Sequence, residues 1–143
     1  MIKRAMGELV RFGVSVDEEL LKRFDKLTVE RGYANRSEAL RDLMRDALVQ
    51  QQWQEDEEVV GVITLLYDHH ARNLEAQLTD IQHDHHEQIL STMHIHLDHD
   101  NCLEIVAVRG TGRQIEALAT RLIGMKGVRH GKLTATATGR GLH

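Results

Sequence analysis

The sequence predicts an α+β protein with two domains, a strand-helix-helix domain followed by a ferredoxin-like (βαββαβ, ACT-like) domain. Apolar residues alternate with period two over residues 10–16 and then follow helical spacing to residue 48. From residue 59 onward, a second series alternates strand-like and helix-like patterns. Residue types divide at the same place, because none of the 10 histidines precedes residue 50, whereas residues 1–49 carry 10 basic and 9 acidic side chains. We therefore expect two domains with different functions.

Length and composition limit the class of protein. The 143 residues suffice for one ordinary domain or two small ones. The single cysteine, Cys102, cannot form an internal disulfide, which excludes a disulfide-rich secreted scaffold. The sequence contains no apolar run of about 18 residues, and its start lacks the apolar stretch of a signal peptide. We expect a cytoplasmic protein without a membrane partner, with domains at residues 1–52 and 59–143 and a linker at residues 53–58.

The first domain is predicted to contain one strand and two helices. The alternation over residues 10–16 is typical of a half-buried strand. A helix is expected to start at Asp17 and to end before Gly32, because acidic residues open this segment and glycine commonly follows a helix. A second helix is expected to start at Asn35, with Glu38 three positions later in the arrangement of a capping box.

The predicted strand has no partner within its own chain. A two-fold dimer solves this problem, because two copies of residues 10–16 can pair as an antiparallel ribbon whose apolar face packs on four helices. Such a ribbon fits the major groove of DNA. Its outward-facing residues are Arg11, Gly13 and Ser15. At the second helix, Arg36 and Ser37 offer charge and amide groups to phosphate. This is the ribbon-helix-helix arrangement, so we expect binding to a palindromic operator in double-stranded DNA.

The second domain is predicted to alternate strands and helices in the order βαββαβ. The six segments are residues 59–67, 70–90, 91–97, 102–108, 114–123 and 128–136. This order is typical of a four-stranded antiparallel sheet with both helices on one face. The other face is then free and needs a partner.

Three metal-ligating side chains share one face of the predicted hairpin. His94 and His96 are two positions apart on its first strand, and the expected register places His96 opposite Cys102. The apolar residues of both strands fall on the other face, which we expect the helices to cover. The three ligands would then project from the uncovered face, and Glu104 on the same face could orient an imidazole.

A fourth ligand is expected from another subunit. His83 points away from the apolar stripe of its own predicted helix, so we expect it to reach a neighbouring copy whose free sheet face is stacked on this one. Three imidazoles and a thiolate suit Zn, Cu or Ni, and the spacing does not decide among these metals. The other histidines of this region are individually more typical of a solvated surface: His69, His70, His85, His86 and His99.

Several segments together resemble a known family, the nickel-responsive ribbon-helix-helix regulators called NikR. The resemblance spans nearly the whole chain. It is carried by RFGVSV at residues 11–16, RGYANRSEALRD at 31–42, QHDHH at 82–86, HIHLDHDNC at 94–102 and VRHG at 128–131. By this resemblance the nickel ligands are His94, His96 and Cys102 with His83 contributed across a tetramer interface, one square-planar Ni(2+) site per subunit. The four positions agree with those obtained from the residues.

The resemblance also implies an assembly and a mode of regulation. It implies a homotetramer, a dimer of dimers, in which nickel is the corepressor for genes of nickel uptake. Its base-reading positions fall on Arg11, Gly13 and Ser15, although Gly13 lacks the threonine side chain that some members carry there. A second cation between the domains would correspond to Glu38 and Asp42. Residues 1–9 extend beyond the shortest members, as an arm that either modulates DNA affinity or is inert.

Two other interpretations remain open. In the first, the ribbon-helix-helix domain is kept and the second domain senses a small molecule such as an amino acid, or another transition metal. In the second, the histidines and Cys102 with Glu104 activate water in a metalloenzyme. Four protein ligands would leave no open coordination position, and the sequence shows no phosphate-binding loop or paired-carboxylate motif. We therefore expect a regulator that is not an enzyme.

Overall fold

The structure is a computed structural model that describes residues 7–143. The first six residues of the N-terminal extension lie outside the described part of the chain. Two compact units are present: one comprises the described part of Met1–Ala47 together with Gly141–His143, and the other comprises Leu48–Arg140. Within residues 7–143, no helix combines the length and the apolar character that crossing a membrane requires.

The helices of the first unit start where the sequence predicts. Helix α1 spans Glu18–Glu30, and the Asp17 carboxylate accepts hydrogen bonds from the backbone amides of its first turn at 3.0 and 3.3 Å. Helix α2 spans Arg36–Gln54 and runs on into the second unit. The amide of Glu38 donates to Oδ1 of Asn35 at 2.9 Å. Gly32 lies between the two helices at φ +76°, a conformation that favours glycine.

The strand predicted over residues 10–16 is absent from the single chain. Residues 7–17 have no regular secondary structure. The four apolar side chains of the predicted face are exposed, at 82, 63, 62 and 49% for Val10, Phe12, Val14 and Val16. The physical reason is that a ribbon needs a second strand for its backbone hydrogen bonds, and the only predicted partner is another copy of the same segment.

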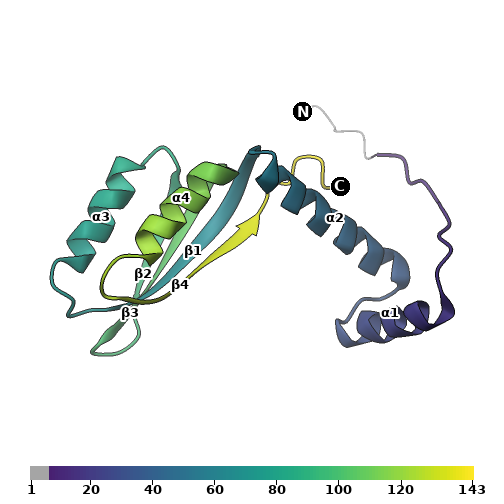
Figure 1. Cartoon of the computed structure of the whole chain (residues 1–143), viewed down its shortest axis with the longest axis horizontal. Coiled ribbons are helices and arrows are strands. Elements are labelled where there is room, and N and C mark those ends of the chain that lie inside the picture. Colours follow the sequence, from purple (N-terminus) through teal and green to yellow (C-terminus); the bar gives the residue numbers. More distant parts are fainter. Residues whose placement is uncertain (1–6) are drawn as a thin grey trace. The chain divides into compact units, whose positions relative to one another are not determined.

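The second unit has the predicted order of elements. Strands β1 (Glu58–Asp68), β2 (Ile89–His96), β3 (Asn101–Thr111) and β4 (Val128–Thr136) form one antiparallel sheet in the order β2-β3-β1-β4. Helices α3 (Leu74–Asp84) and α4 (Gly112–Ile123) lie on the same face of this sheet (Figure 1). Helix α3 is shorter than expected, because Asn73 adopts φ +61° at its start and turns follow Asp84.

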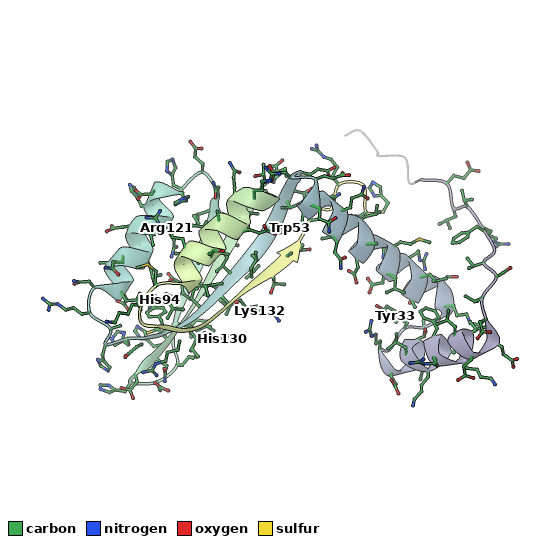
Figure 2. The ribbon with its side chains drawn as sticks, viewed as in Figure 1. Tyr33, Trp53, His94, Arg121, His130 and Lys132 are labelled. Carbon is green, nitrogen blue, oxygen red and sulfur yellow. The ribbon has the colours of Figure 1, made fainter. Side chains whose placement is uncertain are left out.

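The core of the second unit lies between the sheet and the two helices. Alternate residues of β1 and β3 are buried there, beside Leu74 and Leu78 of α3 and Leu118 and Leu122 of α4. Trp53, which we expected in the linker, belongs to this core: it is 9% exposed, and its indole donates to the Thr136 carbonyl at 2.7 Å (Figure 2). The aromatic ring therefore fastens the end of α2 to the last strand.

Candidate functional site

The predicted ligands of the hairpin come together, but on the face of the sheet opposite to the one we expected. Cys102 is fully buried, and it pairs in register with His96 on one side and with the core residue Tyr67 on the other. His94 likewise pairs with Glu104, which is 7% exposed on the helix-covered face. The prediction that these side chains project from the uncovered face is therefore wrong.

The reason lies in the apolar character of both faces of the hairpin. Val106 and Val108 continue the face of Cys102 and are fully buried under the helices. Leu103 and Ile105 lie on the other face and are only half-buried, since no element of the described chain covers it. Periodicity separates the two faces but does not show which one the helices cover.

Cys102 lies at the centre of two overlapping groups of potential ligands. Its Sγ is 3.4 Å from Nδ1 of His96 and 3.4 Å from Nδ1 of His69. The ligand atoms of these three residues lie within 4.8 Å of one another, and so do those of Glu75, His94 and Cys102. The rings of His94 and His96 are 5.2 Å apart between centroids. Five side chains of one chain can thus direct donor atoms toward this region.

Neighbouring groups hold the imidazoles in place. The Tyr67 hydroxyl lies 3.1 Å from Nδ1 of His94 and 3.5 Å from a carboxylate oxygen of Glu75. That carboxylate is also 3.3 Å from Nδ1 of His69 and 3.7 Å from Nε2 of His94. Figure 2 shows His94 at the end of the domain where β2 and α3 lie. These contacts orient two of the candidate ligands, as is usual around metal-binding histidines.

The electrostatic surroundings favour neutral forms of the buried acids. Burial, with the nearby Glu75 carboxylate, raises the pKa of the Cys102 thiol. Burial also raises the pKa of Glu104, whose Oε2 has no hydrogen-bond partner. A divalent cation bound here would offset both effects, because it would favour a thiolate and a carboxylate beside it. The donor set of one soft sulfur and several imidazoles fits a transition metal of the Ni, Cu or Zn group.

His83 is not brought to this cluster within one chain. It lies exposed near the end of α3, and its ring is 6.3 Å from that of His86. Sequence reasoning gave little weight to His69 and did not consider Glu75. The sheet order was the available signal, since it places the end of β1 beside the start of β3 and thereby brings His69 next to Cys102.

The residues predicted to contact DNA lie in the first unit. Arg11, Gly13 and Ser15 are exposed in the segment before α1. Arg36, at the start of α2, forms two hydrogen bonds with the Asp25 carboxylate at 2.7 and 2.8 Å. The charge expected to meet phosphate is therefore paired in the free chain. Ser37 is exposed in the first turn of α2.

The residues proposed for a second cation line a small cavity in the same unit. Glu38 and Asp42 surround it together with Tyr33, Arg41 and Arg45. The Tyr33 hydroxyl donates a short hydrogen bond to Asp42. Two carboxylates and two guanidinium groups face this space, so its formal charges balance.

Two protein families match the chain in succession. Residues 10–51 match the family described as ribbon-helix-helix protein, copG family, and residues 60–136 match the one described as NikR C terminal nickel binding domain. A protein of Geobacter sulfurreducens is 57% identical over 139 residues, covering 96% of this chain and all of that protein. A protein of Nitratidesulfovibrio vulgaris is 55% identical over 138 residues, covering 96% of this chain and 99% of that protein. Both carry the name "Putative nickel-responsive regulator".

A solved structure supports the fold alone. An uncharacterized protein from Thermotoga maritima superimposes with a TM-score of 0.50 at 19% identity, covering 55% of this chain and 98% of that chain.

Proposed function

Because this chain belongs to the NikR family of nickel-responsive transcriptional regulators, with a ribbon-helix-helix DNA-binding domain and no enzymatic role, we propose that it represses nickel-uptake genes when nickel is bound. The observation that carries this proposal is that His94 and His96 each belong to a group of potential ligands that includes the buried Cys102 sulfur, His96 together with His69 and His94 together with Glu75. The relatives are named for a response to nickel, and this donor set suits that metal.

The metal ligands come from two copies of the chain. His94, His96 and Cys102 of one subunit hold the ion together with His83 of the partner subunit. Two features support this arrangement. His94 and His96 lie on β2, an edge strand, where their exposed side chains are accessible to another molecule, and His83 is exposed on α3. When bound, the ion cross-links these side chains and holds the thiol as thiolate. Tyr67, whose hydroxyl lies 3.1 Å from Nδ1 of His94, and Glu104, which pairs with His94 in register, are assigned to orienting that imidazole.

Because the ligands lie on the helix-covered face, the uncovered face of the sheet is available for a different contact between subunits. The uncovered sheet face is apolar, with Met93 at 57% exposure and Ile95, Leu103 and Ile105 half-buried. We assign this face to a contact between subunits that contains no metal, and the edge at β2 and α3 to the contact that shares nickel. Two contacts of different kinds, added to the ribbon, account for a homotetramer built as a dimer of dimers.

The DNA-binding half works as a dimer. Paired copies of residues 10–16 bury the exposed apolar face and present Arg11, Gly13 and Ser15 to the major groove of a palindromic operator. Ser37 and the backbone amides at the N-terminus of α2 bind phosphate. Arg36 also binds phosphate, after it gives up its ion pair with Asp25. Linking subunits through His83 favours those placements of the two ribbons that fit both operator half-sites. Glu38 and Asp42 are assigned to a second cation that adjusts this coupling, and this cation has to displace the guanidinium groups of Arg41 and Arg45 from the same cavity.

Nickel titration of the purified full-length chain tests the proposal. We expect one tightly bound Ni(2+) per subunit that produces a thiolate-to-metal absorption band, and nickel-dependent binding to the upstream DNA of a nickel-uptake operon. Cys102→Ser should lose the band and the nickel dependence, and His83→Ala should lose nickel-dependent DNA binding while it keeps its fold. A response to an amino acid that persists in chelator would contradict the proposal and favour a small-molecule sensor. Activation by Zn or Cu alone would contradict the choice of metal.

A further inference from the structure

A second group of metal-ligating side chains lies outside the Cys102 cluster. His70 follows the end of β1, whereas His99 and Asp100 lie in the turn between β2 and β3. Nε2 of His70 is 3.3 Å from Oδ1 of Asp100, and the rings of His70 and His99 are 4.9 Å apart between centroids. One donor atom from each residue lies within 4.8 Å of the other two. These distances allow a single ion to contact all three side chains after small rotamer adjustments.

The backbone around this group is held together by hydrogen bonds. The amide of His69 donates to the Asp100 carbonyl at 2.8 Å, which joins the loop after β1 to the hairpin turn. Within the turn, the Asp98 carboxylate accepts from the amides of Asp100 and Asn101, each at 2.8 Å. Arg129 of β4 donates to the Asn101 side chain at 2.6 Å. The donor atoms are therefore presented by a braced pair of loops, which lowers the entropy lost when an ion binds.

We propose that His70, His99 and Asp100 form a second site for a divalent transition metal, such as nickel or zinc. Two imidazoles and one carboxylate suit these metals rather than magnesium or calcium, which prefer oxygen ligands. All three side chains are exposed, so water completes the coordination, and the ion exchanges faster than one held by the buried thiol. The site lacks sulfur and needs no second subunit.

The second site connects two loops that lie next to ligands of the Cys102 cluster. An ion there cross-links the loop that carries His69 to the turn that joins the ends of β2 and β3, where His96 and Cys102 lie. A metal ion bound at the second site therefore limits the motion of the side chains that form the Cys102 cluster. This consequence rests on the proposed function, whereas the existence of the site does not.

Metal stoichiometry of the untagged full-length chain tests the inference. Equilibrium dialysis against nickel sulfate, with the bound metal measured by mass spectrometry, should find about two ions per wild-type chain, one of them of weaker affinity. The variant His70→Gln/His99→Gln should lose about one ion and keep the thiolate absorption band. The control His86→Gln/His130→Gln removes two exposed histidines from outside this group and should bind as the wild type does.

The outcomes separate this site from the proposed function. Equal nickel content in His70→Gln/His99→Gln and the wild type would overturn the inference, and so would an equal loss in the control variant. In Cys102→Ser, the remaining ion should disappear when the His70→Gln/His99→Gln changes are added. If the wild type showed no thiolate band but still lost an ion through these changes, the proposed function would fail and the second site would stand.

Discussion

Replacement of Phe12 by alanine should lower the association constant of the DNA-binding domain by two to three orders of magnitude. This estimate follows from the exposed fraction of the Phe12 side chain. The side chain is 63% exposed in the single chain. Full burial of a phenylalanine contributes up to about 3 kcal/mol, so covering this fraction contributes roughly 1.5–2 kcal/mol per copy. The two copies of a ribbon together contribute about 3–4 kcal/mol, and each 1.4 kcal/mol changes an equilibrium constant about tenfold.

Sedimentation equilibrium of the full-length chain, combined with operator binding in nickel, measures this effect. If the proposed assembly is correct, Phe12→Ala should form smaller species at concentrations where the wild type remains associated, and DNA affinity should fall with it. Arg11→Ala is the matched control, since Arg11 lies on the other face of the same predicted strand. It should reduce DNA affinity and leave the assembly unchanged. Unaltered assembly in Phe12→Ala would refute the antiparallel ribbon, because burial of Phe12 between two copies would then not contribute to assembly.

Three further substitutions test other features. Asp25→Asn removes the ion pair that Arg36 must leave before it contacts phosphate, so operator affinity at low salt should rise, and an unchanged affinity would contradict this role. Glu104→Gln should raise the melting temperature of the metal-free chain at pH 8. Burial raises the pKa of Glu104 in the folded chain, so the carboxylate destabilises the fold once the pH rises above the pKa of the unfolded chain. An equal melting temperature of the wild type at pH 5 and pH 8 would argue against this effect. Gly131→Ala places a Cβ 2.5 Å from Ile123 of α4 and should cost about 1–3 kcal/mol of unfolding free energy in urea titrations.

The order of elements was predictable because local signals determine it. Asp17 and Asn35 cap their helices through side-chain oxygens, and this chemistry depends only on residues within a turn. The βαββαβ order and the pairing of His96 with Cys102 follow from alternation and from the length of the hairpin turn. The predictions therefore agree best with the structure where the contacting residues are close together in the sequence.

The errors share a different cause, namely dependence on contacts that are distant in sequence or lie between chains. Residues 10–16 form no strand in the single chain, where no second segment is available to pair with them. The covered face of the hairpin is decided by α3 and α4, and both faces carry enough apolar residues to fit either choice. His69 meets Cys102 only because β1 lies beside β3 in the sheet. Spacing along the chain contains none of this information.

The uncovered sheet face leaves apolar side chains in contact with water in a single chain. Met93, which pairs with Ile105 on this face, and Leu97, which follows β2, are each more than half exposed in the isolated chain. Dilution favours separate chains over complexes. A subunit whose stability depends on association is therefore most vulnerable to proteolysis and aggregation just after synthesis, before it meets another copy.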